Sequence, residues 1–197
     1  MGKHLALAAI AAFLCLSADA QTALEGLKDD HQKKLYYKTE ELPACVTALI
    51  ADDVAVDELV RYHDAAKNEI LKFNIILVLD KKVRNKTIGQ ADIDTCLALF
   101  TKCLTEGNPW IKTEAVFALG NANGKEALPQ IVRCLDDPSA TVVYHAVMAH
   151  VMITKNLPRM TEAQQRKFIK AQEAVVNDRR NELADAELAD YTSTQVY

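Results

Sequence analysis

Apolar residues recur every three to four positions through most of the second half of the chain. Between residues 109 and 121, Ile111, Ala115, Ala118 and Leu119 fall on one helical face, and polar residues fill many of the remaining positions. This spacing is typical of amphipathic helices that pack against a core. The same criterion predicts helices over 69–81, 92–105, 109–119, 127–135 and 139–154.

Glycine, asparagine and proline mark the turns between these helices. Gly107-Asn108-Pro109 and "DDPS" (Asp136 to Ser139) each end a predicted helix, and Asp92 and Asp94 are candidate caps at the start of one. "GNANG" (Gly120 to Gly124) lacks the Lys-Ser/Thr pair that completes a phosphate-binding loop. We therefore interpret it as a helix-to-helix turn, in which Gly and Asn supply the left-handed cap conformation.

The predicted helices repeat in pairs. Leu97–Gly120 and Leu128–Val151 align without a gap at a constant offset of 31 residues, the mark of a helical repeat. A single helix pair cannot bury its apolar face alone, so stacked copies form a continuous core. The matching positions include Leu97 and Leu128, Cys103 and Cys134, Leu104 and Leu135, and Ala115 and Ala146.

Earlier copies of the repeat are fainter. Glu69–Lys81 matches the second helix of the unit at an offset of 40 residues, and Glu41–Asp53 resembles the first helix. The unequal offsets imply an insertion around Arg84–Asp92. The chain therefore contains two clear units and one or two degenerate ones.

The clearest unit resembles a known family of repeats. Ile111 and Lys112 start its second helix, Leu119-Gly120 ends that helix, and Leu135 precedes Asp136-Asp137-Pro138 at the end of the next one. This order resembles HEAT-like repeats of the short type found in phycobilisome lyase subunits. Val143 departs from the family pattern, because a basic residue that contacts a neighbouring acidic turn belongs there.

The resemblance implies an all-α, armadillo-like fold. We expect a short α-solenoid, a right-handed superhelix of HEAT-like helix pairs with terminal capping helices, in which the second helix of each pair lines the concave face. Such repeats specify a fold and leave the activity open.

The N-terminus has the features of a signal peptide. Lys3 and His4 precede an apolar run from Leu5 to Leu16, and the small residues of "SADA" precede Gln21. This order predicts cleavage before Gln21 and export to the periplasm or the extracellular space, with no membrane span in the mature chain. The alternative is a buried N-terminal helix. The expected organisation is a signal peptide (1–20), a solenoid domain (21–160), a C-terminal helix (161–188) and a flexible tail (189–197).

Both ends of the solenoid are expected to carry closing helices. Thr161 and Gln164 form a candidate capping box ahead of a strongly helical segment, 162–188. That helix either caps the last repeat or docks on a partner. Residues 23–42 are the candidate N-terminal cap. The apolar stripe of the C-terminal helix comprises Phe168, Ile169, Val175, Val176 and Leu183.

Composition and motifs argue against several function classes. The formal net charge is −4 and no basic stripe is present, which disfavours nucleic-acid binding. No catalytic or nucleotide-binding signature occurs. His145 and His150 do not share a helical face, and His63 and Asp64 are neighbours without a third partner in the sequence. We therefore expect no catalytic activity, metal or cofactor.

Four cysteines follow the predicted cleavage site. Cys96 and Cys103 lie about 10 Å apart along one helix, too far for a disulfide. A Cys103–Cys134 bridge is permitted in an oxidising compartment, whereas most of these cysteines are expected to be small core residues. Asn85-Lys86-Thr87 is a glycosylation acceptor if the host is eukaryotic.

The second helices carry a candidate contact surface. Large apolar residues lie opposite the alanine face at equivalent repeat positions, beside a tryptophan and a lysine at the start of a helix. We expect this stripe to hold a helix or an extended segment of a partner, unless the C-terminal helix covers it internally. The candidate contact residues are Phe73, Leu77, Trp110, Lys112, Phe117, Tyr144 and Met148.

The sequence therefore predicts an exported, non-catalytic scaffold that binds another protein or peptide. Two alternatives stay open. One is a chromophore or cofactor lyase or chaperone, which the family resemblance suggests. The other is a structural subunit of an envelope assembly.

Overall fold

The described part of the chain is entirely helical. The computed structural model describes residues 18–27, 44–51 and 54–174, in which no strand occurs. The all-α prediction is confirmed for these residues. The helices are α2 (Ala18–Gly26), α3 (Ala44–Ala51), α4 (Val56–Ala65), α5 (Glu69–Arg84), α6 (Gln90–Glu106), α7 (Pro109–Asn121), α8 (Leu128–Arg133) and α9 (Ala140–Thr154), with short 3-10 turns at Lys125–Ala127 and Cys134–Asp136 on either side of α8 and a further helix over 162–174.

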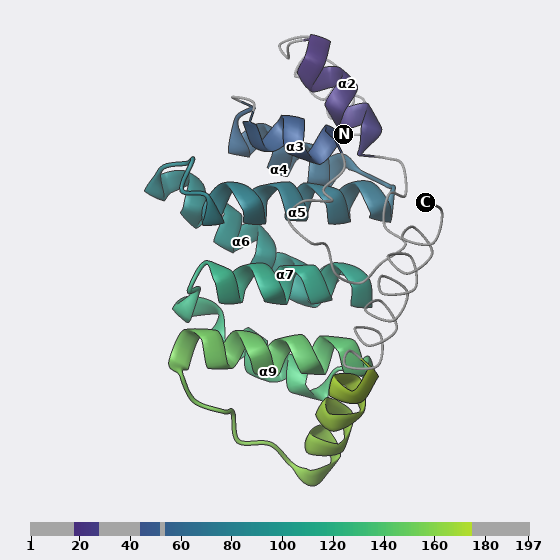
Figure 1. The fold of residues 1–197 in the computed structure, drawn as a ribbon, viewed down its shortest axis with the longest axis vertical. Helices are drawn as coiled ribbons and strands as arrows, with labels where there is room; N and C mark the ends of the chain where they lie inside the picture. Colours follow the sequence, from purple (N-terminus) through teal and green to yellow (C-terminus); the bar gives the residue numbers. More distant parts are fainter. Residues whose placement is uncertain (1–17, 28–43, 52–53, 175–197) are drawn as a thin grey trace, which may run out of the picture.

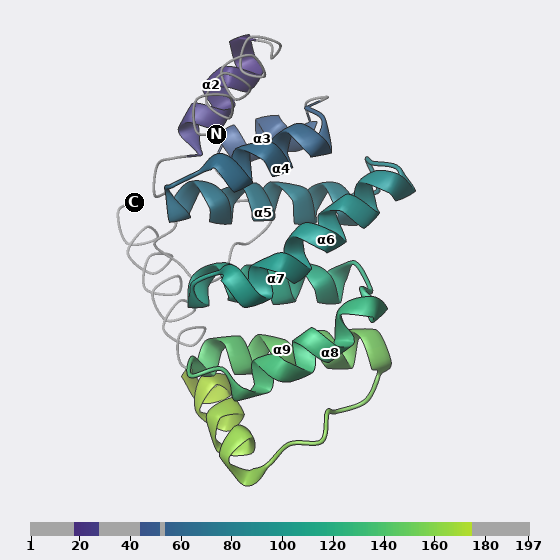
Figure 2. The ribbon, with the colours of Figure 1, turned by 180° about the vertical axis from the view of Figure 1, so that it is seen from behind.

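The helices pack in two layers. A front layer of α3, α5, α7 and α9 faces the viewer in Figure 1, and a back layer of α4, α6 and α8 faces the viewer in Figure 2. Each back helix contacts the front helix that follows it, which gives the pairs α4/α5, α6/α7 and α8/α9. The last two pairs are the two units predicted from the 31-residue offset.

Helix α4 was not among the predicted elements. It is the back-layer partner of α5, a place that the sequence comparison gave to Glu41–Asp53. That earlier segment instead contains α3, which packs against α2 and α5 in the front layer. The sequence prediction therefore assigned the first helix of this degenerate repeat one helix too early, since α4 and not α3 is the back-layer partner of α5.

Asparagine side chains start two of the front helices. The carboxamide oxygen of Asn68 accepts hydrogen bonds from the backbone N–H groups of Ile70 and Leu71. Asn108 does the same for Trp110 and Ile111. Each cap satisfies donors that a helix leaves unpaired in its first turn. The predicted caps Asp92 and Asp94 instead lie inside α6, where Gly89 is the residue before the first turn.

Small residues allow α7 and α9 to approach closely. Ala115, Ala118 and Ala146 are completely buried between the layers. Gly120 lies within α7, and a Cβ atom built on it would be 2.9 Å from the Cα of Ala149 in α9. There is therefore no room for a side chain at position 120. In the "GNANG" turn the left-handed residue is Asn123, with φ of 56°.

The C-terminal capping box is confirmed. The backbone N–H of Thr161 donates to Gln164 Oε1 at 2.8 Å, and the N–H of Gln164 donates to Thr161 Oγ1 at 3.3 Å. The helix over 162–174 follows, and it lies against the end of α9 at which that helix begins (Figures 1 and 2).

Several predictions fall wholly or partly outside the described residues. They concern most of the signal peptide, most of the N-terminal cap (23–42), the end of the C-terminal helix beyond residue 174, and the tail. Helix α2 spans the predicted cleavage point before Gln21, and its Leu24 is buried. Within the described ranges, no helix is both long enough and apolar enough to cross a bilayer.

Candidate functional site

The solvent-accessible positions of α7 and α9 form one stripe on each helix. Trp110 is 38% exposed and Met148 is 37% exposed, whereas Phe117 and Tyr144 are half-buried. The remaining accessible positions of these stripes are polar or aliphatic. These four candidate contact residues therefore keep access to solvent on the front layer.

The other apolar candidates lie in the core. Phe73 and Leu77 of α5 are buried, with 6% and 5% of their surface exposed. Phe73 stacks on Trp110, with the ring centroids 5.2 Å apart. Phe73 therefore supports the indole from beneath.

A second aromatic group surrounds Tyr144. His145 lies edge-on to both Phe117 and Tyr144, at centroid distances of 6.1 and 5.2 Å. The Phe168 ring of the helix over 162–174 stacks on Tyr144 at 5.6 Å. The C-terminal helix thus covers one side of Tyr144, while Met148, one turn further along α9, stays exposed.

Lys112 joins α7 to the "DDPS" turn. Its Nζ donates to Asp137 Oδ2 at 2.9 Å, and the other carboxylate oxygen accepts the backbone N–H of Ser139. The Asp137 carbonyl accepts from Lys167 Nζ at 2.9 Å. Asp137 therefore connects α7, the start of α9 and the C-terminal helix.

A carboxyl group between α5 and α7 has unusual electrostatics. Burial raises the pKa of Glu114 to about 8, and the charge of Asp80 raises it further, against the opposing effects of Arg84 and Lys81. Glu114 forms no hydrogen bond or ion pair with any described residue. Its protonated form is therefore favoured at neutral pH. This environment is not visible in the sequence, because the charged neighbours of Glu114 come from another helix, α5.

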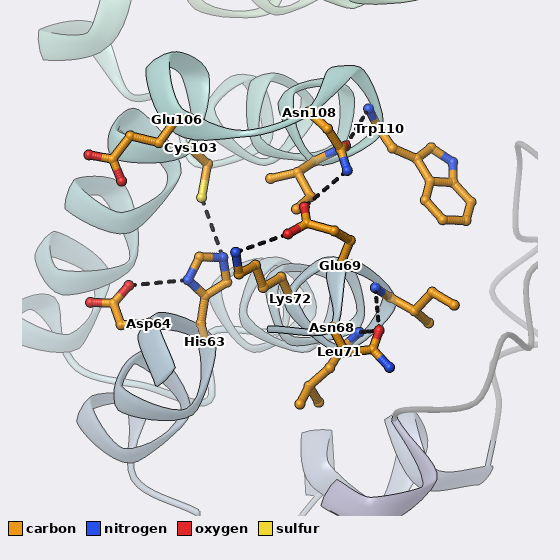
Figure 3. A network of polar contacts seen from close by, with 12 residues as sticks. His63, Asp64, Asn68, Glu69, Leu71, Lys72, Cys103, Glu106, Asn108 and Trp110 are labelled. Carbon is orange, nitrogen blue, oxygen red and sulfur yellow. Dashed lines mark hydrogen bonds and ion pairs between the residues drawn. The ribbon is translucent and has the colours of Figure 1, made fainter. Parts of the chain in front are cut away.

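A third partner for His63 and Asp64 is present after all. Cys103 of α6 places its Sγ 3.6 Å from His63 Nε2, and His63 Nδ1 lies 3.3 Å from Asp64 Oδ1 (Figure 3). Lys102 Nζ donates to the same Asp64 oxygen at 3.0 Å. A thiol, an imidazole and a carboxylate in this order have the arrangement of a catalytic triad, in which they are the nucleophile, the general base and the carboxylate that orients the base.

The electrostatics of this cluster oppose nucleophilic chemistry. Burial raises the pKa of the Cys103 thiol to about 12 and lowers the pKa of His63. The thiol is therefore protonated and donates to a neutral imidazole, whose Nδ1–H donates to Asp64. Reactive cysteines have a lowered pKa and partial exposure, whereas Cys103 is 3% exposed.

A small cavity opens beside this cluster. Its volume is about 90 Å³, and Lys72, Lys102, Glu106 and Gly107 line it together with the cluster residues. That space accommodates a few waters or one small polar group. Both lysines already have a carboxylate partner, since Lys72 pairs with Glu69 at 3.0 Å. In the described part of the chain, no three histidine, cysteine or acidic side chains are grouped to hold a metal.

We expect Cys103 to resist alkylation. At pH 8 a thiol with a pKa of about 12 is ionised in only about one molecule in ten thousand. The half-buried Cys45 should react with iodoacetamide at least about 100-fold faster than Cys103, as peptide mass spectrometry of timed samples will show. Rapid labelling of Cys103 in the folded protein would contradict this assignment.

In the described part of the chain, the cysteines are unbridged, and the two histidines of α9 bond backbone carbonyls. Cys45, Cys96, Cys103 and Cys134 form no disulfide bonds, so the permitted Cys103–Cys134 bridge is not made. His145 Nδ1 bonds the Thr141 carbonyl within α9, and His150 Nδ1 bonds the Asn156 carbonyl after it.

Comparison with known proteins adds no assignment to this geometry. The chain matches no protein-family model, no curated protein and no solved structure.

Proposed function

We propose that this chain is an exported, non-catalytic scaffold that binds another protein or peptide on its front layer. In this proposal the helix pairs form a short HEAT-like α-solenoid, a right-handed superhelix with α5, α7 and α9 on the concave side. The Lys112–Asp137 ion pair supports the family resemblance, because HEAT-like repeats join a basic residue at the start of the second helix to an acidic turn.

The observation that carries the binding proposal is the exposure of Trp110 and Met148 on adjacent front helices. Aromatic residues and methionine are enriched in protein interfaces, and they dominate binding energy where a partner buries them. Phe117 and Tyr144, half-buried beside them, extend the apolar surface. Phe73 supports the Trp110 ring from the core, in which Leu77 is also buried.

The Cys103 cluster does not favour an enzyme. Its protonated thiol and neutral histidine lack the ion pair that activates a cysteine nucleophile. No contact among the described residues specifically favours a lyase. The order of charged, apolar and small residues before Gln21 supports export to the periplasm or the extracellular space.

A paired pull-down tests the binding proposal. Tagged full-length chain is used as bait in envelope and secreted fractions, with Met148→Ser as the test variant. Val132→Ser is the matched control, because Val132 is also an exposed apolar residue, at 43%, but lies on back helix α8. We expect Met148→Ser to reduce recovery of the partner about tenfold or more, and Val132→Ser to leave it unchanged.

Circular dichroism of both variants checks that the helices remain. Equal recovery with both variants would contradict a front-layer site. A partner recovered in fixed stoichiometry and lost only with Val132→Ser would favour the structural-subunit alternative.

A further inference from the structure

The helix over 162–174 touches the rest of the protein along one narrow stripe. Gln164, Lys167, Phe168 and Ala171 are at least half-buried, and every other position of this helix is exposed. The four residues are spaced i, i+3, i+4 and i+7. This is the anchor pattern of an amphipathic helix docked into a surface formed by other helices.

Apart from the capping box of Thr161 and Gln164, each described side-chain hydrogen bond and ring contact of these anchors is made with the turn before α9 or with α9 itself. Gln164 Nε2 donates to Asp136 Oδ1 at 2.7 Å, and Lys167 Nζ donates to the Asp137 carbonyl at 2.9 Å. The Phe168 ring stacks on Tyr144 with an interplanar angle of 13°. The receiving surface therefore offers two acidic-turn oxygens beside one aromatic ring.

The connection to α9 is suited to reversible docking. Residues 155–161 link the two helices, beginning at Lys155 in the left-handed conformation and passing Leu157, which is 68% exposed. Such a tether keeps the helix at high effective concentration, so a few contacts are enough to hold it. A free helix with the same anchors displaces the tethered helix in two cases only. Either it binds the site more tightly, or the contacts of the tethered helix have been weakened.

We propose that the "DDPS" turn and Tyr144 form a helix-docking site, and that the chain's own helix over 162–174 occupies it in place of a partner helix. The partner is an amphipathic helix of another protein with a donor side chain, a lysine or arginine, an adjacent aromatic residue and a small residue at the same spacing. This inference rests on the proposed function, since Tyr144 belongs to the same front-layer surface as Met148.

The charges around the docking site explain why a cationic side chain is favoured among the anchors. Asp136 and Asp137 accept hydrogen bonds and attract cationic donors, and Asp137 is already neutralised in part by Lys112. One further cation on the partner is therefore favoured, and an acidic residue at that position is disfavoured.

The test uses the full chain and a labelled peptide of residues 161–174. Fluorescence anisotropy is measured on wild type and on the Phe168→Ala chain, in which the tethered helix is weakened. We expect the variant chain to bind the peptide about tenfold or more tightly than wild type does. A peptide that itself carries Phe168→Ala should bind neither chain.

Two outcomes of the anisotropy measurement would overturn the proposal. In the first, the peptide binds wild type and the variant chain with equal affinity. In the second, the peptide binds neither chain. If Phe168→Ala unfolds the chain by circular dichroism, Gln164→Ala/Lys167→Ala replaces it. Hydrogen exchange of wild type gives a second readout, since a displaceable helix exchanges faster than α9, and equal protection identifies a permanent cap.

The same data separate this proposal from the broader one. Loss of peptide binding while capture remains sensitive to Met148→Ser would overturn the docking site alone. Peptide binding without any Met148-dependent capture would overturn the proposed function alone. A concentration-dependent dimer that the peptide disperses would replace the foreign helix with a second copy of this chain.

Discussion

Replacing Glu114 with Gln should stabilise the protein at pH 9 and leave it unchanged near pH 4. In the folded state the pKa of this carboxyl is raised from 4.5 to about 8, mainly by burial and then by the charge of Asp80. Such a shift corresponds to about 5 kcal/mol. Because the side chain is half-buried and keeps some solvent contact, we expect a difference of about 2–4 kcal/mol in the free energy of unfolding.

The sign follows from proton binding. The folded protein holds the Glu114 proton more tightly than the unfolded chain does, so this group favours the folded state fully below pH 4.5. That contribution is lost as the pH rises towards about 8. Glutamine cannot ionise, so the variant keeps the neutral state at high pH.

Urea unfolding of wild type and Glu114→Gln between pH 4 and pH 9 measures the difference. Glu126→Gln is the control, since Glu126 is exposed and lies in the 3-10 turn before α8. The Glu114→Gln curve should diverge from that of wild type above about pH 5, and the Glu126→Gln curve should run parallel to it. Parallel curves for both variants would show that Glu114 ionises freely in the folded protein.

Replacing Asp137 with Ala should lower the free energy of unfolding by about 2–3 kcal/mol. The change removes the ion pair with Lys112, whose side chain is 22% exposed, and the hydrogen bond to the Ser139 N–H at the start of α9. Lys112 is then left without its carboxylate partner. The join between the α6/α7 and α8/α9 pairs is weakened as a result.

Asp136→Ala is the matched control in the same turn. Asp136 is exposed and has one described side-chain contact, with Gln164, so the expected loss is below about 0.5 kcal/mol. Thermal unfolding followed by circular dichroism at neutral pH compares the two variants. Equal effects would mean that the Lys112–Asp137 contact contributes little to stability.

Local sequence patterns predicted much of the fold. The second helix of each clear unit starts and ends within one or two residues of its predicted limits, as α7 (Pro109–Asn121) and α9 (Ala140–Thr154) show. The Thr161–Gln164 capping box was also predictable. Helical periodicity, proline positions and caps depend on neighbours along the chain, so one sequence contains them.

Features that depend on distant residues were not predictable in this way. Cys103 reaches His63 across 40 positions, and the raised pKa of Glu114 depends on Asp80 in another helix. The pairing of α4 with α5 is visible only in the packed layers, although the spacing of Val56, Leu59 and His63 along α4 is itself a local helical pattern. The burial of Phe73 and Leu77 likewise follows from packing, since their spacing resembles that of the exposed candidates.

Site-specific photo-crosslinking tests the central claim, a binding surface on the front layer, most directly. Benzoylphenylalanine is placed at position 148 of α9 or at position 132 of α8 in the full chain, and both samples are irradiated in the envelope and secreted fractions. Both positions carry an exposed apolar residue, one in each layer. We predict a covalent adduct of one partner protein from position 148 and none from position 132. An adduct from position 132 alone, or from both positions alike, would contradict it.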